Sequence, residues 1–369
     1  MRRTQGQEID KVLLWVVMIL IAFGLVMISS AGIIYSQTRF GDGYYFFKHQ
    51  LFFGAIPGLL LMYLFQKIDY HYWKKVAFPF FIVSIVCLFL VFIPGIGAKV
   101  YGANRWIHLG IITFQPSEIV KLSMILYLAA WLEGKGEHVI RDFFEGLVPF
   151  LAILGLAGFL ILRQPDMGTL GVLIFISVLM FFVSGAKISH LLTLGSFGLL
   201  ASFVLIKFES YRFNRILAFM DKSIDPQGIG YQINQALLAV GSGGIFGLGL
   251  GHSRQKFNYL PEPVGDSIFA IIGEELGLVG AIFLITLFIM LAFRGFRVAK
   301  NAPDEFGRLI AVGITIWIVV QVFVNIAANI ALVPLTGIPL PFVSYGGTSL
   351  IFLLAAMGIL LNISKHANS

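Results

Sequence analysis

Ten apolar runs, each long enough to cross a lipid bilayer, constrain the fold of this chain more than any other feature. A membrane-spanning helix needs about 17 to 25 predominantly apolar residues. A mean hydropathy of +0.90 with 58% hydrophobic residues is too apolar for a soluble domain of this length. We therefore predict an all-α polytopic membrane protein with ten transmembrane helices, over residues 12–34, 46–65, 76–93, 116–132, 146–162, 168–184, 188–206, 267–293, 309–332 and 342–363.

Lysine and arginine gather in alternate connections between these runs, on the side where both termini fall. Short cytoplasmic loops favour these residues, so this side is predicted to be the cytoplasm. The chain then forms one membrane domain, residues 1–369, with a cytoplasmic N-terminal segment 1–11 and a cytoplasmic C-terminal segment 364–369. The first run has no small-residue cleavage pattern, which favours a signal anchor that is retained.

The connection between the seventh and eighth runs, residues 207–266, is far longer than a typical loop and lies on the outer side. Long loops of this kind are usually functional. Residues 229–240 have the pattern of a short amphipathic helix. The glycine-rich residues 241–251 that follow lack the Gly-Lys-Ser/Thr of a phosphate loop and indicate a flexible or re-entrant backbone.

Asp266 is the first catalytic candidate because acids at membrane depth usually have a function. In a continuous helix it would head a narrow stripe of small residues that includes Gly273 and Gly277, which a neighbouring helix could approach closely. Glu274 and Glu275 would lie about 12 Å or more along the axis, too far to pair with Asp266. One isolated acid suits a sugar transfer with a single general base better than hydrolysis by two carboxyl groups. Glu274, Glu275, Gly273 and Gly277 are predicted to have structural or regulatory roles. Alternatively, the glycines serve only helix packing and the three acids only satisfy one another.

The fourth run begins with a polar cluster. Pro116 suits the first turn of a helix, and Ser117 and Lys121, four residues apart, share a face. Glu118 lies three residues before Lys121, close enough for an ion pair. Two readings of Lys121 stay open: a counterion for Glu118, or a direct ligand of an anionic substrate.

Further polar residues lie in the outer connections. Arg105 and Trp106 fit contacts to a phosphate and a sugar ring, although such a pair is also common at membrane surfaces. Asp166 sits in a tight turn and could be only the N-cap of the sixth span. Prolines and glycines around Ser344 predict an irregular start of the last helix. The candidate substrate-binding residues are Arg105, Trp106, Gln115, Ser117, Lys121, Gln164, Asp166, Gln232 and Ser344.

Cations and one isolated acid facing an outer vestibule would suit an anionic lipid-linked substrate such as a polyprenyl diphosphate sugar. The cations would hold the diphosphate, and the acid would take a proton from a sugar hydroxyl. The sequence has no His-Glu-x-x-His, nucleophile elbow or Walker motif, which argues against a zinc protease, a serine hydrolase and an ATP-driven pump.

Ordered motifs along nearly the whole chain resemble the SEDS family of shape, elongation, division and sporulation proteins. The motifs are Gly102-Ala-Asn-Arg-Trp, Phe114-Gln-Pro-Ser-Glu, Gln164-Pro-Asp-Met-Gly-Thr, Tyr231-Gln, Leu260-Pro-Glu with Asp266 and Gly273-Glu-Glu-Leu-Gly, and Pro339-Leu-Pro-Phe-Val-Ser-Tyr-Gly-Gly. The stretches at Leu260 and Gly273 are more similar to the division branch (FtsW-like) than to the elongation branch (RodA-like). Val264-Gly265 replaces a common His-Thr, so no histidine precedes the acid.

The resemblance implies an inverting peptidoglycan glycosyltransferase that polymerises lipid II at the outer face of the bacterial cytoplasmic membrane. Asp266 matches the essential acid of the family and would deprotonate the 4-hydroxyl of the acceptor, which attacks the anomeric carbon and expels undecaprenyl diphosphate. Arg105 and Lys121 would face the diphosphate. The implied partner is a class B penicillin-binding protein, a transpeptidase. Whether a divalent cation, Mg or Mn, sits beside Asp266 stays open.

Two other classes of function compete with the enzyme. A lipid II flippase or other transporter would use the same polar vestibule, although the chain lacks the inverted repeat of many carriers. A scaffold of the division machinery would tolerate changes at Asp266.

Overall fold

The computed structural model describes residues 8–100, 103–109, 112–208, 210–220 and 228–367, and most of them are helical. In chain order the elements are α1 (Lys11–Ala31), α2 (Ile33–Phe40), α3 (Tyr45–Gln50), the π-helical turn η1 (Leu51–Ala55), α4 (Ile56–Phe65), α5 (His71–Leu90), β1 (Gly97–Val100), β2 (Ala103–Leu109), β3 (Ile112–Phe114), α6 (Pro116–Glu133), α7 (Glu137–Ile140), the π-helical turn η2 (Phe143–Leu147), α8 (Val148–Arg163), α9 (Met167–Val183), α10 (Ile188–Phe208), α11 (Ser210–Met220), α12 (Ile229–Ser242), α13 (Ile268–Lys300), α14 (Glu305–Asn329) and α15 (Gly347–His366).

Each of the ten predicted apolar runs contains a helix. Within the described residues, six helical segments are long and apolar enough to cross a membrane, which confirms a polytopic membrane protein. Of these six, α14 and α15 are the most enclosed, with 72% of their apolar window buried against 44% or less for the others. They therefore form the centre of the bundle.

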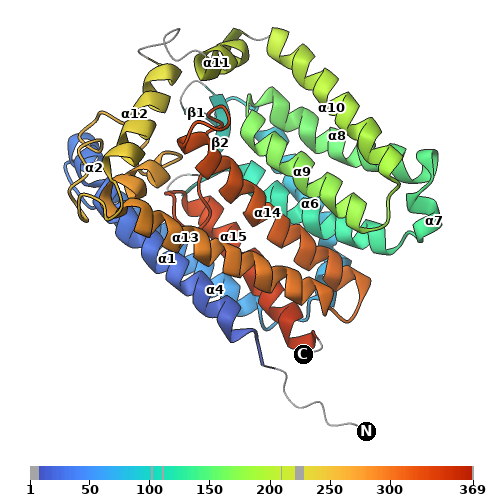
Figure 1. Cartoon of the computed structure of the whole chain (residues 1–369). Helices are drawn as coiled ribbons and strands as arrows, with labels where there is room; N and C mark the ends of the chain where they lie inside the picture. The colour runs from blue at the N-terminus through green and yellow to red at the C-terminus, as the bar shows by residue number, and fades with distance from the viewer. Residues whose placement is uncertain (1–7, 101–102, 110–111, 209, 221–227, 368–369) are drawn as a thin grey trace.

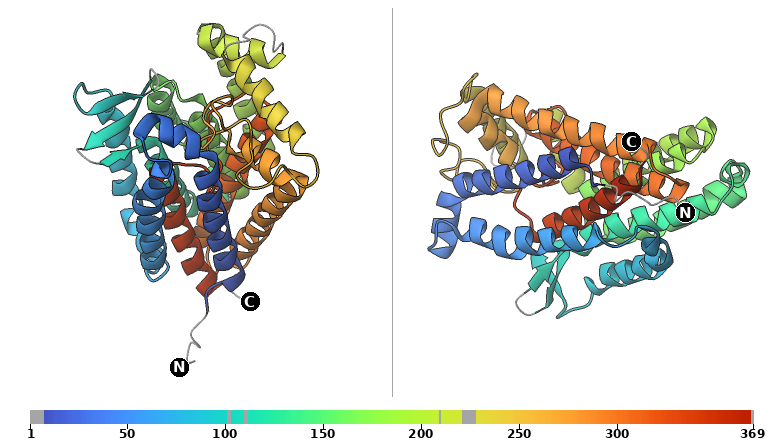
Figure 2. Two further views of the ribbon diagram at one scale, coloured as in Figure 1. Left: turned by 90° about the vertical axis from the view of Figure 1, so that its left-hand side faces the viewer. Right: turned by 90° about the horizontal axis from the view of Figure 1, so that it is seen from below.

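The two ends of the bundle differ (Figures 1 and 2). The start of α1 and the end of α15 lie together at one end, whereas α2, α11, α12 and the small sheet gather at the other. The start of α13, which follows Asp266, lies at the second end beside α12. The polar outer connections predicted from the sequence thus meet at one end of the helix bundle.

A three-stranded antiparallel sheet corrects the all-α prediction. Its order is β1-β2-β3, with Gly97 opposite Ile107 and Ile107 opposite Phe114. In β2 Ile107 is buried, whereas Trp106 is half-buried and His108 is exposed. The strands have only 4, 7 and 3 residues, so their sequence pattern is too short to stand out beside the long apolar runs.

Helix α13 also differs from the prediction, because it begins at Ile268 and breaks at Gly277, where φ is 65° and ψ is −162°. The small-residue stripe headed by Asp266 is therefore not one continuous helical face. The glycine-rich segment fills the break: the amides of Leu248 and Leu278 donate to the carbonyls of Glu274 and Gly244 at 2.9 Å. A Cβ on Gly277 would lie 2.3 Å from the amide nitrogen of Gly247, so both backbones need glycine here.

Most of the remaining local predictions agree with the structure, apart from the start of the last helix. The predicted helix 229–240 is α12, and residues 243–267 that follow it are irregular. Helix α6 begins at Pro116, and the segment before α15 is irregular, so the last helix starts at Gly347 rather than at residue 342. Gly273 packs against α12, its would-be Cβ 3.2 Å from Val240 Cγ2, as close helix packing requires.

Candidate active site

Asp266 lies in a tight turn two residues before α13. The carbonyl oxygen of Glu262, whose φ is 48°, accepts hydrogen bonds from the amides of Gly265 at 3.0 Å and Ser267 at 3.4 Å. The turn leaves the Asp266 side chain half-buried. Its Oδ1 accepts only long contacts of 3.5 Å, from Gln232 Nε2 and from Ser267 Oγ. Among the described residues its carboxylate has no shorter hydrogen bond, so a substrate hydroxyl could approach it.

The electrostatic surroundings of Asp266 favour a base that works near neutral pH. Burial in the turn, helped by the nearby Glu262 carboxylate, raises the pKa of Asp266 to about 6, and the Arg215 guanidinium opposes the rise. A general base is most effective when its pKa lies near the operating pH. With its pKa raised in this way, the Asp266 carboxylate is a stronger base than an ordinary aspartate.

Ser344 holds the last outer loop against the Asp266 turn. Its hydroxyl donates to the carbonyl of Gly265 at 2.7 Å and accepts from the amide of Leu340 at 2.8 Å. The amide of Tyr345 donates to the carbonyl of Val264 at 2.8 Å. The predicted site residues Ser344, Gln232 and Asp266 are therefore brought together by the structure.

Glu274 and Glu275 lie in a different environment, 1% and 0% exposed. Glu275 accepts from Ser30 Oγ at 2.6 Å and pairs with Lys256 Nζ at 3.0 Å. Glu274 accepts from the hydroxyl of Ser253 and from neighbouring loop amides. The two acids fasten the loop after the glycine-rich segment to α13 and α1.

Lys121 is 1% exposed and enclosed by protein. Its Nζ pairs with Glu118 Oε1 at 2.8 Å, donates to Gln321 Oε1 at 3.2 Å and lies 5.0 Å from the centre of the Trp317 ring. The structure thus contains the counterion arrangement expected for Glu118. Ser117 beside it is fully buried.

A second group of predicted residues surrounds the turn between α8 and α9. Asp166 is the N-cap of α9 and accepts from the amide and the hydroxyl of Thr169. Gln115 Nε2 also donates to the Asp166 carboxylate, at 3.3 Å. Arg105 donates through Nε to the carbonyl of Gln164 at 3.1 Å and also to that of Pro165. Trp106 is half-buried on β2. These contacts brace the sheet against the start of α9.

Polar residues on α14, which were not among the predicted site residues, connect these groups. Trp317, Gln321, Asn325 and Asn329 recur every fourth residue and therefore share one face. Gln321 touches Lys121, while Asn325 and Asn329 donate through Nδ2 to the carbonyl of Asp266 at 2.9 and 2.8 Å. A polar stripe at helical spacing inside an apolar run is a sequence signal that could have identified them.

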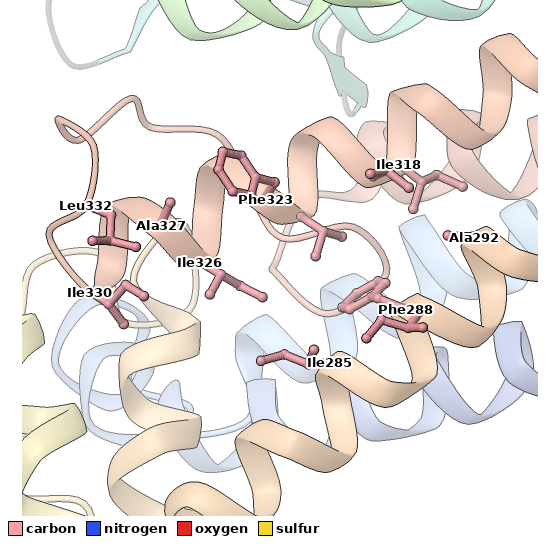
Figure 3. Close-up of a pocket in the computed structure, with 12 residues that line it drawn as sticks. Ile285, Phe288, Ala292, Ile318, Phe323, Ile326, Ala327, Ile330 and Leu332 are labelled. Atoms are coloured by element: carbon pink, nitrogen blue, oxygen red, sulfur yellow. The ribbon is translucent and has the colours of Figure 1, made fainter.

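An apolar groove of about 300 Å³ runs between α13 and α14 (Figure 3). Figure 3 shows Ile285 and Phe288 of α13 facing Ile326 of α14 across it. Ile330 and Leu332 close the end that follows Asn329, next to the Asp266 turn. Its lining consists entirely of apolar side chains.

The part of the chain that the structure describes contains no group of three or more His, Cys, Asp and Glu side chains able to hold a metal ion. Glu262 is the acid that acts on Asp266 through its charge.

Comparisons with known proteins give one consistent result. The family model described as "Cell cycle protein", for FtsW, RodA and SpoVE, matches residues 10–369. Stage V sporulation protein E of Bacillus subtilis is 43% identical over 99% of both chains, and the probable peptidoglycan glycosyltransferase FtsW of Geobacter sp. is 42% identical over 99% of both. A solved structure, on the coordination of polymerization and crosslinking by a peptidoglycan synthase complex, matches with a TM-score of 0.81 and 28% identity over 96% of this chain and 97% of that one.

Proposed function

The chain belongs to the FtsW/RodA/SpoVE family of cell cycle proteins, and we propose that it is a peptidoglycan glycosyltransferase that polymerises lipid II into glycan strands. The observation that carries the proposal is Asp266, a half-buried acid with a firmly held backbone, a loosely held carboxylate and a pKa raised to about 6 by burial. Such a group can act as a general base for a sugar hydroxyl.

In the proposed mechanism Asp266 takes the proton of the acceptor 4-hydroxyl as its oxygen attacks the anomeric carbon of the donor. The bond from that carbon to the diphosphate breaks, and undecaprenyl diphosphate leaves from the opposite face, so the configuration inverts. Asp266 then releases its proton to the outer solution. Gln232, 3.5 Å from its Oδ1, is placed to orient the acceptor.

The leaving diphosphate needs positive charge. Arg215 lies close enough to Asp266 to influence its pKa, and Arg105 braces the neighbouring turn, so we assign both to the diphosphate side of the site. Lys121 is buried against Glu118 and Gln321, so its proposed role is to hold α6 and α14 in place. Gln115, Gln164, Asp166 and Ser344 are proposed to shape the site through the contacts described above, and Ser117 through its buried position at the start of α6.

The proposed topology has ten spans in the bacterial cytoplasmic membrane, with residues 207–266 outside and both termini in the cytoplasm. Its support is the helix in each apolar run and the position of the start of α1 and the end of α15 at one end of the bundle. The identities of 42% and 43% to FtsW and stage V sporulation protein E favour the division and sporulation branches.

The proposed partner is a class B penicillin-binding protein, and we place its membrane helix in the groove of Figure 3. The groove is apolar throughout, and Ile289 and Phe323 on its walls are 62% and 64% exposed. A bulky Ile289→Trp change, at an exposed position of the groove wall, should reduce co-purification of the transpeptidase, whereas Val86→Trp at an exposed position of α5 should not. Equal co-purification of both variants would remove the groove from the proposal.

The experiment that tests the function supplies purified lipid II to the wild-type protein and to Asp266→Asn, each with the transpeptidase, and resolves the glycan chains on a gel. We expect polymer from the wild type alone. Polymer from both would place the base elsewhere. Polymer from neither, together with lipid II translocation in vesicles, would favour a transporter.

A further inference from the structure

Two asparagine amides of α14 converge on one backbone atom. Asn325 Nδ2 and Asn329 Nδ2 lie 2.9 and 2.8 Å from the carbonyl oxygen of Asp266. Both asparagines are 1% exposed and come from a membrane-spanning helix. Polar amides on such a helix are costly to bury, so their shared target calls for a reason.

Satisfying a buried carbonyl takes one donor, and the Asp266 carbonyl has two. Asn325 also donates to the carbonyl of Ile338 at 2.8 Å, and Asn329 to the carbonyl of Asn325 at 3.0 Å. The two amides thus join α14 to the Asp266 turn and to the last outer loop. Because α14 is among the most enclosed helices, it gives these loops a rigid support.

The rest of Asp266 is held much less firmly. Its carboxylate contacts, to Gln232 and Ser267, are 3.5 Å long. Sites built on rigid elements keep reacting groups within a fraction of an ångström of the productive geometry. With a loosely bonded carboxylate, that accuracy has to come from the backbone.

We propose that Asn325 and Asn329 are positioning residues for glycosyl transfer, a pair of amides that fixes the Asp266 backbone so that its carboxylate meets the acceptor hydroxyl. The inference rests on the proposed function, because it assigns Asp266 the part of the base. It adds that α14, which carries neither the base nor the diphosphate cations, sets the accuracy of the reaction.

The test measures kcat, KM for lipid II and the pH dependence of polymerisation for Asn325→Ala, Asn329→Ala and the double variant, each as the full chain with its transpeptidase. We expect kcat to fall about tenfold in each single variant and at least about a hundredfold in the double variant, because a misplacement of about 1 Å costs that much. KM should stay unchanged. The acid limb of the pH profile should move to lower pH, because a freed carboxylate reaches solvent and loses the effect of burial.

Thr315→Val is the matched control. Thr315 is buried on the same helix, and within the described residues its hydroxyl bonds only inside α14, to the carbonyl of Ala311 at 2.7 Å. It should keep the wild-type kcat and pH profile. If an alanine variant does not fold, Asn329→Ser leaves a small polar group in place and carries the same expectation.

The outcomes distinguish a failure of the positioning role of Asn325 and Asn329 from a failure of Asp266 as the base. Wild-type kcat and an unmoved acid limb in the double variant would overturn the positioning role, even with Asp266→Asn inactive. A lower thermal midpoint with kcat unchanged would reduce the pair to a structural role and overturn it too. An active Asp266→Asn would instead remove the proposed base, and the inference with it.

Discussion

Asp266 and the pair Glu274–Glu275 lie within one short stretch of chain, but their carboxylates differ in how they are hydrogen-bonded. At Glu275 the carboxylate is fully buried and bonded to Ser30, Ser253 and Lys256. At Asp266 the backbone carbonyl is bonded twice, whereas the carboxylate has, from the part of the chain that the structure describes, only 3.5 Å contacts. An acid with satisfied oxygens stabilises the fold, and an acid with a fixed backbone and free oxygens is available for chemistry.

The largest difference between the two acids is expected when each is exchanged for its amide. Asp266→Asn should lower polymerase activity by about 10² to 10⁴, the contribution of a general base. Glu275→Gln should instead leave Lys256 buried without its countercharge, a loss of about 3 to 5 kcal/mol of stability, with activity retained per folded molecule. Polymer assays and thermal midpoints on both variants check this, and a folded, inactive Glu275→Gln would contradict the division of roles.

Asp266→Asn should also change the stability in the direction opposite to Glu275→Gln. The folded-state pKa of Asp266 is raised to about 6, above its ordinary value of 3.8, so its ionisation opposes folding. That cost is fully present above the folded pKa and disappears as the pH falls to the ordinary value. At pH 7 the thermal midpoint of Asp266→Asn should equal or exceed the wild-type value. A clear decrease would mean that the carboxylate is a structural group.

A smaller effect is expected from the two charged residues that influence the pKa of Asp266. Glu262 raises the pKa of Asp266 and Arg215 lowers it. Glu262→Gln should therefore move the acid limb of the activity profile to lower pH, and Arg215→Gln should move it to higher pH. Shifts in the same direction, measured over the pH profile, would show that the limb belongs to another group.

The smallest expected effect concerns the buried pair on α6. Lys121→Met with Glu118→Leu removes both charges together, and replacing a buried ion pair by apolar groups is often close to neutral for stability. The double variant should fold, whereas Lys121→Met alone should lower the thermal midpoint by leaving Glu118 unpaired. If the double variant folds and loses all polymerase activity, Lys121 has a direct part in substrate binding.

The long apolar helices could be predicted from the sequence, because a membrane-spanning helix requires mainly sufficient length and apolarity. The run at residues 309–332, for example, became α14. The break at Gly277 and the sheet at Ile107 could not be predicted, since the break depends on backbone partners 26 to 34 residues earlier and the sheet on short strands. Asp266 stood out as an acid beside an apolar run, but Asn325 and Asn329 act through a contact that only the folded chain creates.

The most direct test of the central claim is the rate of glycan polymerisation between about pH 5 and pH 8 for the wild type and for Asp266→Asn. If Asp266 is the base, the wild-type rate rises as a group of pKa about 6 loses its proton, whereas the variant polymerises about 10² to 10⁴ times more slowly and shows no such rise. A variant with residual polymerisation and the same acid limb as the wild type would contradict the assignment of Asp266 as the base.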